Sequence, residues 1–167
     1  MAVYFGSLND VTIERRETAE AGRAAARLMK GLEVALGQTG LSLPQYRLLL
    51  FLSGGAERAT ALAAWLDVSP PSLTALVDGA VSRGLVQRVP LEEDRRCVRH
   101  EITPLGHEKL SLADGVLVDK LGSVVSYLDP DEAERAIEGL RLLGKALDAI
   151  RAEKDANDAA RVTGAAR

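Results

Sequence analysis

Residues 61–82 read "ALAAWLDVSPPSLTALVDGAVS" and place two helical segments on either side of a tight turn. Ser69 is a residue type preferred as a helix N-cap, and Pro70 follows at the first helical position, where a missing N–H costs nothing. The spacing predicts a helix over Pro70–Ser82 with one apolar stripe. A short helix, a tight turn and a second helix form the helix-turn-helix pattern, so a mainly α-helical fold is expected.

Two strand-like runs follow this pattern directly. They are "GLVQRV" at residues 84–89 and "CVRHEI" at residues 97–102, and the second run alternates between two sets of side chains. The segment between them, "PLEEDRR", is too long for a two-residue turn and suits an extended hairpin tip. A β-hairpin directly after a helix-turn-helix forms a winged helix. The predicted fold class is therefore mainly α with a small β wing.

Long amphipathic helices are predicted on both sides of the winged helix, at residues 11–36, 104–128 and 130–150. Their apolar stripes exceed what one small winged helix can cover, so we expect a partner chain. After Ile150 the apolar periodicity fades, which predicts a frayed or disordered tail. The predicted units are an amino-terminal dimerisation helix at 1–40, a winged helix-turn-helix domain at 41–103, carboxy-terminal dimerisation helices at 104–151 and the tail at 152–167.

Composition narrows the class of protein without choosing a function. Hydrophobic residues make up 47% and charged residues 27% of the chain, as in ordinary globular proteins. The formal net charge of −3 argues against a polyanion partner, but the acidic excess lies in the carboxy-terminal third and leaves room for a local basic face. No apolar run is long enough to cross a membrane and no signal sequence opens the chain, so we expect a cytoplasmic protein without a membrane partner.

Residues that could carry cofactor, metal or enzyme chemistry are scarce. The chain has a single cysteine, Cys97, and two histidines, His100 and His107, so a Cys/His metal cluster is poorly supplied. It shows no nucleophile with a base, no glycine-rich phosphate loop and no recognisable carboxylate pair. We therefore expect no cofactor, no metal and no enzymatic activity. Cys97 is interpreted as filler in a strand rather than as a redox sensor, because the chain has no second cysteine to resolve an oxidised one.

The segment "LSLPQYRLLLFLS…ALAAWLDVSPPSLTALVDGAVSRGLVQRVPLEEDRRCVRHEITPLG", within residues 41–110, resembles the MarR family of bacterial transcription regulators. The family pattern reads roughly "LA..L.VS.S.VT.LVD.LE..GLV.R", then a wing with "DRR", then "LT..G". The matching positions are Gln45, Leu62, Ala63, Leu66, Val68, Ser69, Ser72, Thr74, Leu76, Val77, Asp78, Gly84, Leu85, Val86, Arg88, Asp94, Arg95, Arg96, Ile102, Thr103 and Gly106. The resemblance implies a homodimer whose first and last two helices intertwine. It also implies that the partner is double-stranded DNA, namely a pseudo-palindromic operator. The two winged helices would bind in successive major grooves of this operator.

By this resemblance the predicted helix Pro70–Ser82 is the recognition helix. The residues expected to face DNA are small, and they are Ser69, Pro71, Ser72, Thr74, Ala75 and Gly79. Family members often carry a basic side chain at the positions of Ala75 and Gly79, and without it this helix cannot recognise guanine through a bidentate contact. Contacts are expected instead from the Ser72 and Thr74 hydroxyls, and from Pro71 or Ala75 against thymine methyls. The amino terminus of the helix is expected on a phosphate.

The resemblance also gives roles to the expected wing tip. Asp94 would hold the wing in shape, and Arg95 and Arg96 would contact DNA, with Arg96 as the residue that enters the minor groove. The alternative interpretation is that both arginines are solvated and paired with Glu92 and Glu93.

Similar proteins often bind a small aromatic or phenolic effector between the dimer helices and the DNA-binding lobe, where its occupancy changes the separation of the recognition helices. Arg16, Arg23, Tyr46 and Arg47 could line such a crevice, although ordinary surface roles suit each of them, and none is assigned to it.

Two functions remain open on the sequence. The first is a dimeric, sequence-specific DNA-binding regulator, a repressor whose DNA affinity a small ligand modulates. The alternative is a winged-helix protein-interaction dimer that no longer binds DNA, which the uncharged recognition face and the negative net charge would favour.

Overall fold

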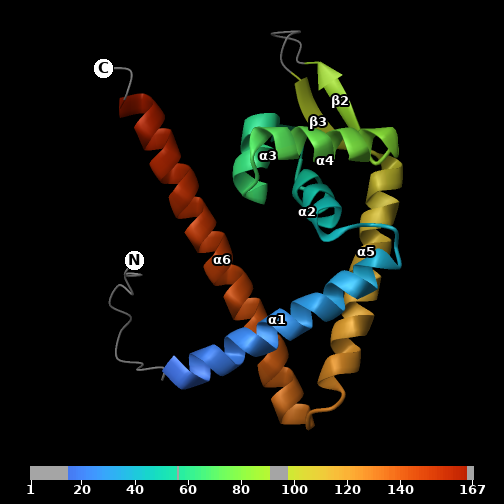
Figure 1. Ribbon diagram of the computed structural model, residues 1–167, viewed down its shortest axis with the longest axis vertical. Helices are drawn as coiled ribbons and strands as arrows, with labels where there is room; N and C mark the ends of the chain where they lie inside the picture. The colour runs from blue at the N-terminus through green and yellow to red at the C-terminus, as the bar shows by residue number, and fades with distance from the viewer. Residues whose placement is uncertain (1–14, 56, 91–97, 165–167) are drawn as a thin grey trace.

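The computed structural model describes residues 15–55, 57–90 and 98–164. In this part of the chain, helices make up most of the fold and a small antiparallel sheet lies at one end of it, beside α4 (Figure 1). The elements in chain order are α1 (Arg15–Gly37), α2 (Leu43–Leu52), β1 (Glu57–Arg58), α3 (Ala59–Leu66), α4 (Pro70–Ser82), β2 (Val86–Pro90), β3 (Val98–Ile102), α5 (Pro104–Val125) and α6 (Pro130–Gly164). The mainly α fold with a β wing, predicted from the sequence, is confirmed.

Local capping chemistry fixes the starts of three helices. At α2 the Gln45 N–H donates to Ser42 Oγ at 3.4 Å and the Ser42 N–H donates to Gln45 Oε1 at 3.1 Å, which is a capping box. Ser69 caps α4, and Thr103 caps α5 by accepting the Gly106 N–H at 3.0 Å. Each cap satisfies an amide that the first helical turn leaves without a partner.

The turn between α3 and α4 is a Schellman motif. The Val68 N–H donates to the carbonyl of Ala63 at 3.2 Å and the Asp67 N–H donates to that of Ala64 at 3.3 Å. Asp67 holds the left-handed conformation that this motif requires, with φ 55°. The same motif ends α4, where Gly84 at φ 69° takes the equivalent place. Together the two motifs set the orientation of α4 relative to α3 and to β2.

The sheet has the order β1-β3-β2 with antiparallel pairing throughout. Val86 pairs with Ile102 and Pro90 pairs with Val98, so β2 and β3 form the hairpin that the sequence predicts. The two-residue strand β1 adds Glu57 opposite His100. That third strand was not expected from the sequence.

The hydrophobic core lies within the winged helix and the ends of α1 and α5 that meet it. Its buried members are Leu36, Leu41, Leu48, Leu49, Leu52, Leu62, Leu66, Leu73, Val77, Ala80, Leu85, Val86, Leu110 and Ala113. This core holds α4 from one side only, because Leu73, Val77 and Ala80 lie on a single face of that helix.

The start of α5 is joined closely to the start of β2. The Thr103 N–H donates to the Leu85 carbonyl at 3.1 Å, and Thr103 Oγ1 donates to the Gly84 carbonyl at 2.7 Å. Gly106 lies against the same backbone, where a Cβ would come within 2.2 Å of the Leu85 carbonyl oxygen. Glycine is therefore required at this position by a close approach of two backbone segments.

Helix α6 departs from the prediction in length. Its helical conformation continues to Gly164, so the expected frayed or disordered tail at 152–167 is wrong for residues 152–164, and residues 165–167 lie outside the described part. The segment after Ile150 is rich in alanine and in charged residues with high helix propensity, and propensity sustains the helix where apolar periodicity has ended.

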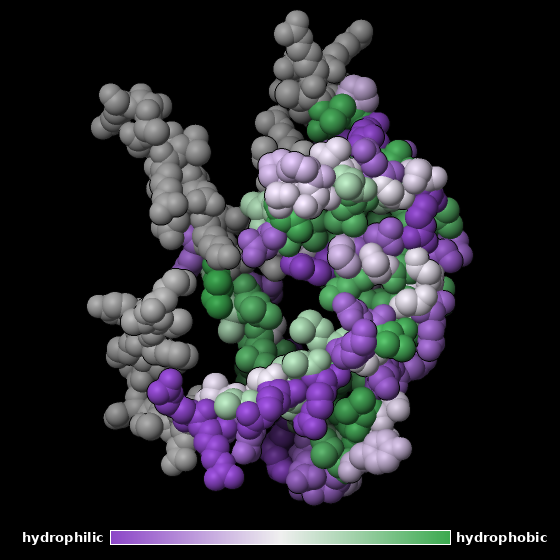
Figure 2. All heavy atoms as spheres, viewed as in Figure 1, coloured by the Kyte–Doolittle hydropathy of each residue, from purple (hydrophilic) through white to green (hydrophobic). Residues whose placement is uncertain are grey.

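Among the side chains of α6 that the structure describes, none is buried. The exposed large apolar residues on this helix are Ile137, Leu140, Leu142, Leu143, Leu147 and Ile150. Figure 2 shows a green patch near the middle of α6, above the place where α1 crosses in front of it. Helix α6 therefore presents an apolar face that the described part of its own chain does not cover.

Candidate nucleic-acid interface

Helix α4 presents its outer side to solvent beside the β2–β3 hairpin (Figure 1). Pro71, Ser72, Thr74 and Ala75 are exposed on this side, and Gly79 is half-buried. The structure thus brings the predicted recognition residues together on one surface. Within α4 this surface carries one charged side chain, Asp78.

The first turn of α4 lacks the free amides that phosphate binding would use. Pro70 and Pro71 have no N–H, and the Ser72 N–H donates to Ser69 Oγ at 3.4 Å. The amides of this first turn therefore offer no free donor, and the expected phosphate contact at the amino terminus of α4 stays a prediction. The Ser69 and Ser72 hydroxyls lie 2.8 Å apart, and one of their two protons remains available to an outside acceptor.

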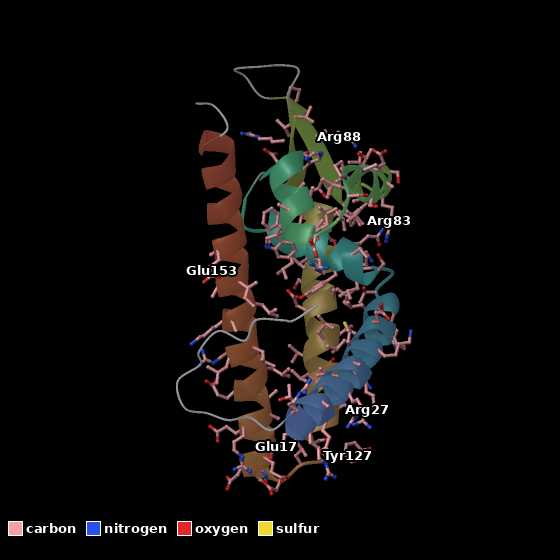
Figure 3. The ribbon with its side chains drawn as sticks, turned by 60° about the vertical axis from the view of Figure 1, so that its left-hand side comes forward. Glu17, Arg27, Arg83, Arg88, Tyr127 and Glu153 are labelled. Atoms are coloured by element: carbon pink, nitrogen blue, oxygen red, sulfur yellow. The ribbon has the colours of Figure 1, made fainter. Side chains whose placement is uncertain are left out.

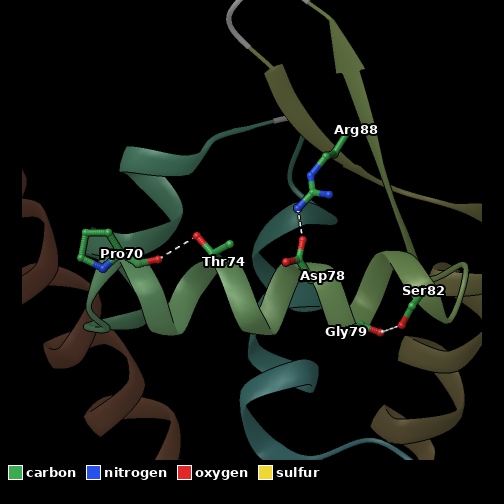
Figure 4. A network of polar contacts seen from close by, with 6 residues as sticks. All are labelled: Pro70, Thr74, Asp78, Gly79, Ser82 and Arg88. Carbon is green, nitrogen blue, oxygen red and sulfur yellow. Dashed lines mark hydrogen bonds and ion pairs between the residues drawn. The ribbon is translucent and has the colours of Figure 1, made fainter.

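The Thr74 hydroxyl is turned back onto its own helix. Thr74 Oγ1 donates to the Pro70 carbonyl at 3.0 Å (Figure 4). Because this bond uses the hydroxyl proton, Thr74 has no hydrogen left to donate to a base. The Thr74 side chain is exposed, and its methyl group is the part that this bond does not engage.

An ion pair links the outer face of α4 to the wing. The guanidinium of Arg88 on β2 contacts the carboxylate of Asp78 (Figure 4). Both side chains are partly exposed. The sequence shows Asp78 and Arg88 only as matches to the family pattern, because the pair depends on how β2 crosses α4 and no local pattern indicates that crossing.

The other described cations near this surface also have partners. Arg83 donates from Nη1 to Gln45 Oε1 at 2.9 Å, which ties the end of α4 to the capping box of α2. Arg99 pairs with Glu101 along β3, with Nε and Oε1 2.9 Å apart. Figure 3 shows Arg83 and Arg88 at the α4 end of the molecule, opposite to the end that carries Arg27.

The predicted wing residues Asp94, Arg95 and Arg96 lie outside the described residues, as do Cys97 and the alternative partners Glu92 and Glu93. The structure describes the strands that lead to them, β2 up to Pro90 and β3 from Val98. Their roles therefore stay predictions.

The residues considered for an effector site are held in separate contacts. Tyr46 Oη donates to Asp114 Oδ1 at 2.8 Å and so joins α2 to α5. Burial, with the hydrogen bond to Asp114 as a second cause, raises the pKa of Tyr46 to about 12.

Arg47 lies over the Trp65 ring, with its guanidinium carbon 5.6 Å from the ring centroid. Arg16 pairs with Glu20 within α1, and Arg23 is exposed on the same helix. Effector binding by these four residues stays a prediction.

No group of three or more His, Cys, Asp or Glu side chains arranged to hold a metal ion occurs in the described segments. Among the described helices none combines the length and apolarity that a membrane span needs.

Comparison with known proteins gives a match to a family model described as the MarR family, over residues 39–96. YfiV of Bacillus subtilis (strain 168), an uncharacterized HTH-type transcriptional regulator, is 30% identical over 121 residues. That alignment covers 68% of this chain and 71% of YfiV.

Solved structures show the same fold. The transcriptional regulator BldR from Sulfolobus solfataricus is 27% identical, with a TM-score of 0.60, and the match covers 80% of this chain and 99% of that one. The transcriptional repressor CouR, solved bound to a 23-mer DNA duplex, is 21% identical with a TM-score of 0.63 and the same coverage.

Proposed function

The chain belongs to the MarR family of transcriptional regulators, and on that premise we propose that it is a dimeric, sequence-specific DNA-binding repressor whose DNA affinity a small ligand modulates. The members of this family are regulators rather than enzymes. The observation that carries the proposal is the placement of α4, which the core holds from one side and which is exposed on the other beside a β-hairpin.

In the proposed complex, α4 enters the major groove and the wing reaches the adjacent minor groove. Ser69 or Ser72 supplies a hydroxyl to a phosphate, and Pro71, Thr74, Ala75 and Gly79 face the bases. Arg95 and Arg96 supply the wing contacts, with Arg96 in the minor groove and Asp94 as the brace of the wing. The DNA-bound form of CouR supports the choice of partner.

Dimerisation is proposed from the uncovered apolar face of α6. A second copy of the chain would bury Leu143 and Leu147, which are 61% and 60% exposed. Two copies related by a two-fold axis would present two α4 helices to a pseudo-palindromic operator. Sedimentation equilibrium should show a dimer that Leu147→Lys weakens and that Lys145→Glu, on an exposed polar position of the same helix, leaves intact.

Ligand modulation is proposed from the link between the DNA-binding lobe and the flanking helices. The hydroxyl of Tyr46 on α2 donates a hydrogen bond to Asp114 on α5 and so contributes to joining the two parts. A small aromatic or phenolic ligand that separates α2 from α5 would change the position of α4, because α2 and α4 share the core. A thermal-shift screen of such compounds tests this, since a ligand that binds the folded protein raises its Tm.

Fluorescence anisotropy with the chain's own upstream DNA tests the main proposal. We expect binding that weakens with salt and that Arg96→Ala reduces. Arg27→Ala is the matched control, because it removes one exposed arginine from the opposite end of the molecule (Figure 3). Equal losses in both variants would contradict a specific role for the wing.

The second candidate is a protein-interaction dimer that does not bind DNA. One observation favours it, namely that the one charged side chain on α4 is an acid, Asp78. Absent binding, or binding that salt does not affect, would select this candidate over the repressor.

A further inference from the structure

We propose that α4 reads thymine methyl groups through Pro71, Thr74 and Ala75, which makes these three residues the determinants of operator sequence. This inference rests on the proposed DNA binding and adds to it the feature of the base pairs that the helix recognises.

The three residues form one continuous surface. They stand at positions i, i+3 and i+4 of α4, so their side chains are neighbours on the helix. All three are exposed on the side opposite to the buried Leu73 and Val77. A duplex that accepts α4 in its major groove would meet this surface first.

The side chains of Pro71, Thr74 and Ala75 offer the bases no free hydrogen-bond donor. Thr74 Oγ1 donates to the Pro70 carbonyl at 3.0 Å, and Pro71 has no N–H. The Asp78 carboxylate is paired with Arg88 (Figure 4). Apart from the Thr74 oxygen, which can still accept a hydrogen bond, these three side chains present carbon to the bases, namely the Pro71 ring, the Thr74 methyl and the Ala75 methyl.

Apolar side chains can recognise one feature of the base edges in the major groove, the methyl group of thymine. Direct recognition of guanine uses Arg or Lys, and that of adenine uses Asn or Gln, and α4 contains none of the four. The C5-methyl of thymine is the group on the base edges that apolar side chains contact favourably. The composition and the hydrogen bonding of α4 therefore both favour thymine.

The test replaces thymines one at a time by deoxyuridine in the DNA fragment that the protein binds. This change removes the methyl and leaves base pairing intact. At one or more positions opposite α4 we expect Kd to rise roughly fourfold, which corresponds to about 0.8 kcal/mol for one buried carbon group.

Variants of Thr74 connect the effect to the helix. Thr74→Ser keeps the hydroxyl and removes the methyl, so at least one sensitive thymine should become insensitive to deoxyuridine. Thr74→Val keeps a methyl and removes the hydroxyl, so the sensitivity should persist. Ala75→Gly should remove the sensitivity of a neighbouring thymine, and Ser82→Ala, at the other end of α4, should remove none. Circular dichroism of each variant verifies that α4 is retained.

The outcomes separate this inference from the function on which it rests. A protein that binds its DNA but responds to no deoxyuridine overturns methyl reading and leaves DNA binding standing. Sensitivity that persists unchanged in both Thr74→Ser and Ala75→Gly also overturns it, because the methyls would then be read elsewhere. A protein that binds no duplex at all overturns the proposed function and the inference together.

Discussion

The Arg88 guanidinium on β2 is ion-paired with the Asp78 carboxylate on the outer face of α4 (Figure 4). The pair joins the wing to the helix that we propose to enter the major groove. Because the two side chains are 40% and 55% exposed, solvent screens the pair, and such pairs contribute only about 0.2–1 kcal/mol to stability. Its main effect is on charge, since Asp78 neutralises a cation that lies beside the surface proposed to face DNA.

Asp78→Asn should tighten DNA binding. The change removes an acid from the surface that faces phosphates and frees Arg88 to reach one of them. We expect the slope of log affinity against log salt to become steeper by about 0.9, the value for one additional phosphate contact. Anisotropy titrations at several salt concentrations measure this slope.

Glu138→Gln is the control for Asp78→Asn, because it disrupts the exposed Arg141–Glu138 pair on α6 and should leave the slope unchanged. Weaker binding by Asp78→Asn would mean that Asp78 itself contacts a base or holds Arg88 in its productive position.

Gly106→Ala should destabilise the winged helix. The added Cβ would lie 2.2 Å from the Leu85 carbonyl oxygen and 2.7 Å from Ile102 Cγ1, so the backbone must move. Overpacking of this kind costs about 1–3 kcal/mol. Urea denaturation measures the loss, and Gly115→Ala on the exposed side of the same helix, where a Cβ meets nothing within 4 Å, should not destabilise. Equal stabilities of the two variants would contradict the close approach.

Substitutions of Asp67 test whether its backbone conformation or its side chain stabilises the turn between α3 and α4. At φ 55°, Asp67→Ala should lower the free energy of unfolding by about 1 kcal/mol, because a Cβ disfavours the left-handed region and alanine lacks the local hydrogen bonding of aspartate. Asp67→Gly should not lower it comparably, since glycine adopts this conformation freely. Thermal unfolding of both variants is the measurement. If glycine proves as harmful as alanine, the aspartate side chain stabilises the turn.

Tyr46 should make stability fall at high pH. Its pKa is about 12 in the folded protein against an ordinary value of 10.0, so the folded state holds the proton more tightly than the unfolded state. The resulting stabilisation is complete below 10.0 and is lost as pH rises through about 12. Denaturation across this range should give a steeper loss for the wild type than for Tyr46→Phe, whereas parallel losses would exclude a contribution from this group.

Local chemistry is the part of this structure that the sequence predicts well. Ser69 caps α4 as expected, because an N-cap depends on residues within one turn of it. The bounds Pro70–Ser82 are confirmed for the same reason. The lack of an N–H at the first two positions of α4 also follows from the sequence, because both are proline, Pro70 and Pro71.

Long-range pairing is the part that the sequence does not predict. Residues 57–58 become a strand only because β3 offers them an edge, and two residues have no periodicity of their own. The contact of Arg88 with Asp78 likewise depends on where β2 passes α4. The sequence predicts too short an α6, because the predicted end of the helix rests on apolar periodicity, which reflects packing. After Ile150 the helix continues on helix propensity alone.

The joint between α5 and the wing has a mechanical consequence. Thr103 and Gly106 meet Leu85 through two hydrogen bonds to the backbone of residues 84–85 and one contact without spare volume, so this place can neither stretch nor compress. A rotation of α5 about its amino-terminal end is therefore transmitted to β2 and to the end of α4, and the three segments move as one rigid body. Any flexibility that the regulator needs must reside in other connections, such as the turn between α1 and α2.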